Sequence, residues 1–341
     1  MIKYDFQNDY SEGCHPSILT MLLKTNLDQH QGYGDDSLSE EARRLIKKKL
    51  NNTNVDIYFV AGGTLANLLV ISAALRPHES IIAANTGHIN THEAGAIEAT
   101  GHKINTIVNK DGKIRVKDIQ AVLDEHIIIP HMVKPKMVYI SNSTELGTIY
   151  KKKELEDLSH FCKIRGLYLF LDGARLGSAL CSKANDLAFP DLPDLTDIFY
   201  IGGTKNGALL GEAIVINNDK LKKDFPFYLK QKGALMSKGR LLGVQFAALF
   251  EEDLFFDLAK HANLMSMKIA QGIKQKGYSL LAEPVSNQIF PVLPDKLIEK
   301  LEKKYLFHIW EKIDNHHSAI RLVTSWATHE TVVDELISDL G

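Results

Sequence analysis

Residues 198 to 207 read Ile-Phe-Tyr-Ile-Gly-Gly-Thr-Lys-Asn-Gly, an apolar run that ends in a glycine turn carrying Lys205. A lysine on a tight turn at the end of a buried strand is placed for covalent chemistry through its amine. Upstream, residues 167 to 175 read Leu-Tyr-Leu-Phe-Leu-Asp-Gly-Ala-Arg, so Asp172 ends a second apolar run and Arg175 follows three residues later. We expect the two strands to carry an amine and a carboxylate to one edge of a sheet.

Around these runs, strand-like segments alternate with helix-like segments from about residue 35 to 216, which is typical of an α/β domain. The apolar run 57–60 predicts a buried strand, and the turn that follows it leads into a helix predicted from Thr64 to Arg76. Such continuous apolar strands belong in a mainly parallel sheet covered on both faces. The run 212–216 returns quickly from the Lys205 turn, which predicts an antiparallel strand.

Beyond about residue 240 the pattern becomes mostly helical, with strand candidates at 287–293 and 319–324. We therefore expect a large domain over residues 20–246 and a smaller α+β C-terminal domain over residues 247–341. Residues 1–19 are expected to contribute to the active site or to the smaller domain.

Composition narrows the class of protein further. The chain has 341 residues, of which 45% are hydrophobic and 24% charged, enough to bury a large core. A formal net charge of −2 gives no support to a nucleic-acid or anionic-membrane partner. Its three cysteines have neither zinc-site nor disulfide spacing, and no apolar run resembles a signal peptide or a membrane span. We expect a cytoplasmic protein.

Several polar residues should meet at the carboxyl ends of the strands, where open α/β sheets bind ligands. Gly63 and Thr64, at the start of a predicted helix, offer N–H groups, a hydroxyl and the helix dipole to a phosphate. A simple turn with an N-cap is the more ordinary explanation of that pair alone. Asp172 suits a pyridine nitrogen, whose protonation a carboxylate maintains, and Lys205 suits a Schiff base with an aldehyde. Together these residues predict a pyridoxal phosphate site.

Two further groups have competing interpretations. Arg321 has apolar neighbours that would hold its guanidinium for a substrate carboxylate, although a structural ion pair is the alternative. The segment 86–95 contains His88, His92 and Glu93, which suggests zinc at first sight. The sequence indicates no third zinc ligand, and the residues do not follow the His-Glu-x-x-His motif of zinc proteases. We therefore expect no metal. In a pyridoxal phosphate site, His88 could stack on the cofactor ring, close to substrate protons.

The chain resembles the threonine aldolase group of the β-eliminating lyases, which are pyridoxal phosphate enzymes of the aspartate-aminotransferase-like fold, fold type I. The resemblance covers nearly the whole chain and rests on Asn8-Asp9, Gly32-Tyr33-Gly34-Asp35-Asp36, Ala61-Gly62-Gly63-Thr64-Leu65-Ala66-Asn67, Gly87-His88, Leu171-Asp172-Gly173-Ala174-Arg175-Leu176, Gly202-Gly203-Thr204-Lys205-Asn206-Gly207 and the Arg321 to Trp326 segment. Many aldolases have Ser-Asp in place of Asn8-Asp9 and Ser-Lys-Gly at the lysine.

The resemblance implies a role for each matching residue. Lys205 would form the Schiff base, Asp172 would pair with the ring nitrogen and His88 would stack on the ring. The remaining roles are phosphate contacts from Gly63 and Thr64, cofactor or substrate contacts from Arg175 and Arg321, substrate contacts from Asn8 and Tyr33, and a phosphate-region contact from Arg240 of a neighbouring subunit.

The activity that the resemblance implies is cleavage of a β-hydroxy-α-amino acid, foremost L-threonine or L-allo-threonine, to glycine and acetaldehyde. The base would be His88 or a bound water. Alternatives are β-elimination from another amino acid with Lys205 as base, aminotransfer, and a cofactor-binding module without turnover. A homodimer or homotetramer is expected, with residues 32–36 and Arg240 completing a neighbour's site. The natural substrate and the stereochemistry at Cβ do not follow from the sequence.

Overall fold

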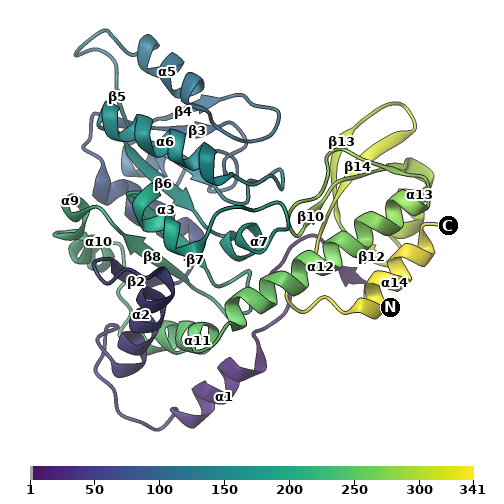
Figure 1. Cartoon of the computed structure of the whole chain (residues 1–341), viewed down its shortest axis with the longest axis horizontal. Coiled ribbons are helices and arrows are strands. Elements are labelled where there is room, and N and C mark those ends of the chain that lie inside the picture. Colours follow the sequence, from purple (N-terminus) through teal and green to yellow (C-terminus); the bar gives the residue numbers. More distant parts are fainter. Residues whose placement is uncertain (1–2) are drawn as a thin grey trace.

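The computed structural model describes residues 3–341 and contains a large sheet, a small sheet and a long helix between them (Figure 1). The large sheet has seven strands in the order β2-β8-β7-β6-β5-β3-β4. Its strands are β2 (Asp56–Val60), β3 (Glu79–Ala84), β4 (Ile104–Ile107), β5 (Lys134–Ser141), β6 (Tyr168–Asp172), β7 (Ile198–Gly202) and β8 (Glu212–Ile216). The pairs from β4 through β7 are parallel, and β8 is antiparallel to both of its neighbours.

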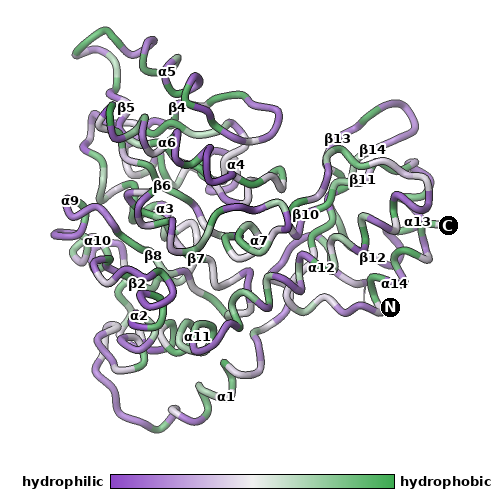
Figure 2. The backbone as a smooth tube through the Cα atoms, viewed as in Figure 1, coloured by the Kyte–Doolittle hydropathy of each residue, from purple (hydrophilic) through white to green (hydrophobic). Residues whose placement is uncertain are grey.

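Both faces of the large sheet are covered, because successive strand residues pack into two separate hydrophobic clusters. On β6, Leu171 belongs to one cluster and Phe170 to the other. Helices α2 (Ser37–Leu50), α5 (Val116–Glu125), α6 (Lys152–Arg165) and α11 (Arg240–Phe250) cover the first face, and α3 (Gly63–Ala74) and α10 (Phe225–Gln231) cover the second. Hydrophobic colour accordingly dominates the strands of this sheet in Figure 2.

Shorter segments complete the large part of the molecule. They are α1 (Pro16–Lys24), α4 (His88–Thr91), α7 (Leu176–Leu180), α8 (Leu192–Leu195), α9 (Asp219–Lys222) and the 3₁₀ turns Glu98–Thr100 and Phe189–Asp191. Helix α6 ends at Gly166, whose φ of 64° reverses the chain directly into β6.

Two glycines bring the ends of β6 and β7 unusually close. A Cβ atom at Gly173 would lie 1.8 Å from the carbonyl oxygen of Tyr200, and one at Gly202 would lie 2.3 Å from that of Ala174. The N–H of Gly202 instead donates to the carbonyl of Gly173 at 2.9 Å. This close approach places the segment after Asp172 directly beside the Lys205 turn.

The small part of the molecule contains strand β1 (Tyr4–Asp5), early in the chain, and helix α14 (Glu330–Asp339), late in the chain (Figure 1). The strands of the small sheet are β9 (Ser279–Leu280), β10 (Gln288–Ile289), β11 (Pro291–Pro294), β13 (His308–Lys312) and β14 (His317–Val323), and β1 pairs in parallel with β12 (Tyr305–Leu306). Helices α13 (Asp295–Leu301) and α14 belong to the same part. Helix α12 (Leu254–Gln275) packs against both α7 and α14, which joins the two parts.

The structure confirms the mainly parallel α/β sheet and the antiparallel β8 strand. The helix predicted from Thr64 begins one residue earlier and ends at Ala74. The strand predicted at 287–293 is divided into β10 and β11, and β1, β4, β9, β12 and β13 were not predicted. Strand β13 lacks an apolar run because most of its residues are exposed. The domain limits at residues 246 and 247 stay a prediction.

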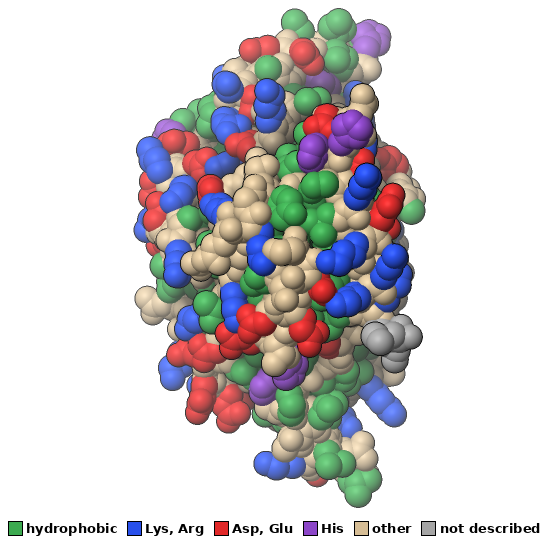
Figure 3. All heavy atoms as spheres, turned by 90° about the vertical axis from the view of Figure 1, so that its right-hand side faces the viewer, with side chains coloured by type: hydrophobic (Ala, Val, Ile, Leu, Met, Phe, Trp, Pro, Cys, Tyr) green, Lys and Arg blue, Asp and Glu red, His purple; other side chains and the backbone are tan. Residues whose placement is uncertain are grey.

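The face shown in Figure 3 carries both acidic and basic side chains, with hydrophobic and uncharged surface near its middle. Along residues 3–341, none of the helices combines the length and the apolar character needed to cross a bilayer.

Candidate active site

A cavity of about 260 Å³ opens at the carboxyl ends of β2, β5, β6 and β7. Six of the ten residues predicted for the site line it, namely Gly63, Thr64, His88, Asp172, Arg175 and Lys205. The rest of the wall comes from residues without a predicted role, which are Tyr10, Ala61, Gly62, Ser141, Ser143, Glu145, Ala174, Tyr200, Thr204 and Glu212.

Asp172, the last residue of β6, is 3% exposed and is held by four donors. Its Oδ2 accepts from the Tyr139 hydroxyl at 2.5 Å and from Asn67 Nδ2 at 3.2 Å. Its Oδ1 accepts from the Tyr200 hydroxyl and from the N–H of Ala174 at 3.0 Å. Burial and then the Asp172 charge raise the pKa of both phenols well above 10, so each remains a donor.

Lys205 follows β7 on a turn that the backbone fixes. The N–H groups of Gly203 and Thr204 donate to the carbonyl of Gly211 at 3.0 and 3.1 Å, and the Gly211 N–H donates to Thr204 Oγ1 at 2.9 Å. Burial, followed by the charge of Arg175, lowers the pKa of the Lys205 amine. A lowered pKa increases the neutral, nucleophilic fraction of the amine near pH 7.

Glu212 is a buried carboxyl beside this turn, and the sequence predicted it only as the start of a strand. In the sheet it lies between Val60 and Gly202, and its Oε2 accepts from the N–H of Gly203 at 3.0 Å. Burial raises the pKa of Glu212 to about 8, and the nearby Lys205 opposes this shift. The missed signal is a single glutamate within an otherwise apolar strand, directly after Gly211.

The start of α3 forms one wall of the cavity. Within residues 3–341, no side chain caps this helix, so its first N–H groups face the cavity region without a side-chain acceptor. A Cβ atom at Gly63 would lie 3.2 Å from the Tyr200 hydroxyl, which requires a very small residue there. The wall is therefore suited to the close approach of an anion such as a phosphate.

His88, the first residue of α4, lines the cavity with a side chain that is 33% exposed. Its Nδ1 lies 2.8 Å from Glu93 Oε1, and its backbone N–H donates to Glu145 Oε1 at 3.0 Å. Glu93 also accepts from Asn67 Nδ2 at 2.7 Å. Neither Glu93 nor Asn67 had a predicted role, although Glu93 lies in the segment 86–95 and Asn67 in the segment 61–67.

Arg175 is paired with Asp9 by two bonds, from Nε to Oδ2 at 2.7 Å and from Nη2 to Oδ1 at 3.0 Å. Asn287 Nδ2 also donates to Asp9 Oδ2 at 2.9 Å. Burial alone would raise the pKa of Asp9, but the Arg175 and Lys205 charges hold it below its usual value. Two of the three guanidinium nitrogens of Arg175 thus hold the N-terminal segment against the cavity.

Four of the residues predicted for the site lie outside the cavity wall of this chain. Asn8 shapes a turn, since its Oδ1 accepts from the Tyr10 N–H at 2.9 Å. Arg321 Nη2 donates to the Gln7 carbonyl at 3.0 Å, and its Nε is buried without a partner in the described part of the chain. The ion pair considered for Arg321 is not found among residues 3–341, which leaves the guanidinium available to an anion.

Tyr33 and Arg240, the other two, lie on neighbouring segments away from the cavity. The Tyr33 N–H donates to the Ser237 carbonyl at 3.1 Å, and Arg240 Nη1 donates to the Thr25 carbonyl at 3.1 Å.

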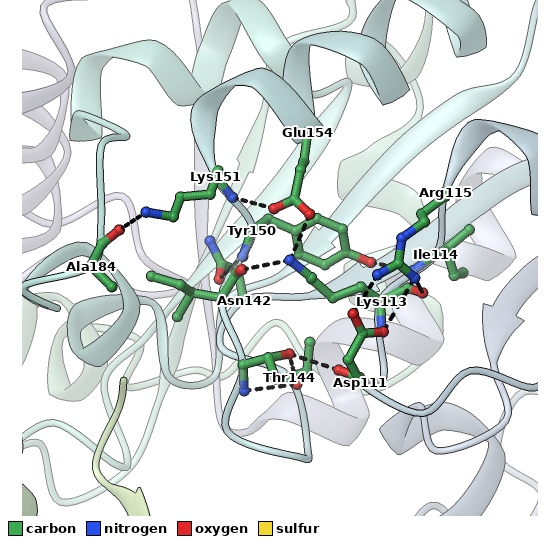
Figure 4. A network of polar contacts seen from close by, with 12 residues as sticks. Asp111, Lys113, Ile114, Arg115, Asn142, Thr144, Tyr150, Lys151, Glu154 and Ala184 are labelled. Carbon is green, nitrogen blue, oxygen red and sulfur yellow. Dashed lines mark hydrogen bonds and ion pairs between the residues drawn. The ribbon is translucent and has the colours of Figure 1, made fainter. Parts of the chain in front are cut away.

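The loop after β5, which carries Glu145, is fixed by the polar network in Figure 4. Asn142 Oδ1 accepts from the N–H of Tyr150 at 3.2 Å, and the Tyr150 hydroxyl accepts from the N–H of Ile114 at 2.7 Å. Lys113 Nζ also donates to Oε1 of Glu154, a residue of α6, at 2.6 Å. The loop is therefore anchored to the segment before α5 and to α6.

Among residues 3–341, no group of three or more His, Cys, Asp or Glu side chains is arranged to hold a metal ion. The paired His88 and His92 rings, with centroids 5.6 Å apart, instead meet edge to face.

Comparison with known proteins now identifies the family. The family model described as Beta-eliminating lyase matches residues 5–295, so the chain belongs to this family of pyridoxal phosphate-dependent lyases. Within it, the chain is 32% identical over 338 residues to the low specificity L-threonine aldolase of a Pseudomonas species, covering 98% of this chain and 96% of the relative. The corresponding protein of Pseudomonas aeruginosa is 31% identical, with the same coverage.

Solved structures give the same result. The threonine aldolase of Leishmania major superimposes with a TM-score of 0.97 at 49% identity, covering 99% of this chain and 98% of that one. An aspartate aminotransferase of Thermus thermophilus has a TM-score of 0.72 at 13% identity over 99% of this chain and 90% of its own, which shows the shared fold alone. The expected fold type I architecture is thus confirmed.

Proposed function

We propose that this chain cleaves β-hydroxy-α-amino acids, foremost L-threonine or L-allo-threonine, to glycine and acetaldehyde. The observation that carries the proposal is the meeting of Lys205, Asp172 and His88 in one cavity beside the uncapped start of α3. The low specificity L-threonine aldolases among its relatives, matched over nearly their whole length, support this choice of reaction.

The residues in the cavity fit pyridoxal phosphate. A buried amine of lowered pKa suits its aldehyde, a buried carboxylate suits its pyridine nitrogen, and the helix start suits its phosphate. Asp172 already accepts four hydrogen bonds, so a pyridinium N–H would share an oxygen with one of its present donors. When bound, the cofactor supplies an electron sink for the bond cleaved at the substrate Cα.

Each protein group then has a defined task. Lys205 would hold the cofactor covalently and release it to the substrate amine. Arg321, whose Nε lacks a partner within residues 3–341, would bind the substrate carboxylate. His88 would lie against the cofactor ring and accept the β-hydroxyl proton, directly or through a water. Thr64 and Gly63 would hold the phosphate.

The test is a product assay on purified protein supplied with pyridoxal phosphate. With L-threonine and L-allo-threonine we expect glycine and acetaldehyde in equal amounts, and none from the Lys205→Ala variant. Pyruvate and ammonia from an aromatic or sulfur-containing amino acid would support β-elimination instead. Bound cofactor with no product from a panel of amino acids would support a binding module.

We also propose that the enzyme works in the cytoplasm as a homodimer or homotetramer. Residues 32–36 and Arg240 would complete the site of a neighbouring subunit, and their position side by side, away from this chain's own cavity, supports that idea. Exposed leucines of α1, Leu19 and Leu23, offer apolar area for the contact. Light scattering would test the assembly, and a fully active monomer would contradict it.

A further inference from the structure

Glu93 is a buried carboxylate to which the proposed reaction assigns no task. Its side chain has no exposed surface, and it lies behind His88 rather than in the cavity wall. Taking a carboxylate out of water is costly unless partners compensate for the lost hydration. Both partners of Glu93 act on its Oε1, which accepts from Asn67 Nδ2 at 2.7 Å and lies 2.8 Å from His88 Nδ1.

The contact with Glu93 decides which nitrogen of His88 carries a hydrogen. An ionised carboxylate only accepts hydrogen bonds, so Nδ1 of His88 must be the N–H donor. In the neutral ring this leaves the lone pair on Nε2, at the opposite edge of the imidazole. Because the ring itself lines the cavity, Nε2 is then the nitrogen able to receive a proton there.

Asn67 connects the same carboxylate to the site's other buried acid. Its Nδ2 donates to Glu93 Oε1 at 2.7 Å and to Asp172 Oδ2 at 3.2 Å, which uses both hydrogens of one amide. The reverse orientation of the amide would put its oxygen against two carboxylates, so the two acceptors fix the orientation. Asn67 is fully buried on α3, the helix whose start faces the cavity, and this holds the contact rigidly.

We infer that Glu93 is a positioning residue that fixes the ring orientation and the Nδ1–H tautomer of His88, and that Asn67 secures Glu93 in this position. The link from His88 through Glu93 and Asn67 to Asp172 places the proton acceptor and the partner of the ring nitrogen in one rigid network. The catalytic consequence rests on the proposed function, whereas the tautomer is a property of the protein alone.

The first measurement is the tautomer of His88 in the cofactor-free protein, read from ¹⁵N chemical shifts of the imidazole and assigned with a His88→Phe variant. We expect the Nδ1–H form in the natural protein and a shift toward the Nε2–H form in Glu93→Leu. The same change at the exposed Glu98 serves as the matched control and should leave the His88 signals in place. An Nε2–H tautomer in the natural protein would overturn the inference without any variant.

The second measurement is a double-mutant cycle on threonine cleavage. Glu93→Leu should lower kcat by roughly 10- to 100-fold, the size of the effect when a group that orients a metal-binding histidine is lost. Adding Glu93→Leu to His88→Phe should then cost little more, because Glu93 acts through His88. If the two substitutions instead lower kcat by independent factors that multiply in the double variant, the inference is overturned. If Glu93→Leu does not fold, Glu93→Gln enters the same cycle.

The two measurements separate this inference from the proposed function. If the protein cleaves no threonine but the tautomer changes as expected, only the proposed function fails. If threonine is cleaved but the tautomer and kcat are unchanged in Glu93→Leu, only the inference fails.

Discussion

Asp9 and Arg175 form a two-bond ion pair, 2.7 and 3.0 Å long, that ties the N-terminal segment to the end of the large sheet. Both side chains are largely buried, so water cannot take the place of either partner if it is removed. The pair therefore contributes to the stability of the fold and to the shape of the cavity wall at once.

Removal of Asp9 should reveal the first of these contributions. Asp9→Asn leaves the buried Arg175 charge without its partner, so the free energy of unfolding should fall by roughly 3–5 kcal/mol. Urea unfolding measures the change. Asp257→Asn is the matched control: it removes an exposed pair with Lys260, 2.9 Å long, and should cost less than about 1 kcal/mol. Equal losses in the two variants would contradict the prediction.

The same pair predicts a response to acid. Because the pKa of Asp9 is lowered on folding, its contribution is present above its unfolded value of about 3.9 and is lost as the pH falls through the lower folded value. Unfolding free energies measured between pH 6 and pH 3 should therefore fall less steeply in Asp9→Asn than in the natural protein. Parallel curves would argue against the pair as a source of stability.

Lys205 should carry the cofactor. After borohydride reduction of the cofactor-loaded protein, peptide mapping should find the pyridoxyl group on Lys205, and Lys205→Ala should take up no label. We base this on its buried amine of lowered pKa within the cavity. A label on another lysine would refute the assignment.

Asp172→Asn should still bind the cofactor but lose turnover. The amide cannot keep the pyridine nitrogen protonated, so kcat should fall by at least about tenfold, equivalent to about 1.4 kcal/mol of transition-state stabilisation. Cofactor absorbance and threonine cleavage measured on the same sample separate binding from turnover. Unchanged turnover would count against the proposed pose of the cofactor.

Arg321→Ala should weaken binding of the substrate and leave binding of the cofactor unchanged. Loss of hydrogen bonds to a charged carboxylate, worth about 1.5–3 kcal/mol, should raise the KM for threonine by roughly 10- to 100-fold. Arg165→Ala, at an exposed position, is the control. Cofactor absorbance should stay unchanged in both variants, and a normal KM in Arg321→Ala would leave the guanidinium without a role in substrate binding.

Glu212 should make the stability of the cofactor-free protein decrease between pH 5 and pH 8. Its pKa rises to about 8 on folding, so the contribution of Glu212 to stability is fully present below its unfolded value of about 4.3 and is lost as the pH rises through the folded value. In Glu212→Gln, the fall in unfolding free energy between pH 5 and pH 8 should become smaller. Identical pH profiles would show that Glu212 stays ionised in the fold.

The sequence was sufficient for strands β2, β6, β7 and β8 of the large sheet because they are continuous apolar runs next to glycine turns, whereas β4, with Asn105 and Thr106 at its centre, was not predicted. For the same reason it located Asp172 and Lys205, which occupy the ends of two such runs. It was insufficient for Tyr139, Glu93 and Asn67, whose tasks depend on contacts between segments far apart in the chain. Tyr139 lies inside an apolar strand, where nothing distinguishes a hydrogen-bonded phenol from ordinary core.

The small sheet was harder to predict for a different physical reason. Strands β9 and β12 have two residues each, and β13 is mostly exposed, so neither length nor alternating burial marks them. These strands are defined by pairing with a partner strand. Strand β12, for example, pairs with β1. Prediction was accurate where a segment's own residues determine its structure and poor where a distant partner does.

The pairing of β1 with β12 also sets the order in which the molecule can be completed. Phe6 donates to Leu306 and accepts from Val323, at 2.8 and 2.9 Å, and three residues later Asp9 meets Arg175. Because translation proceeds from the N-terminal side, this segment is made well before its partners Leu306 and Val323. It must therefore wait for residues 306 and 323 before its pairing in the small sheet is in place, so a nascent chain can form much of the large sheet yet lack an assembled site.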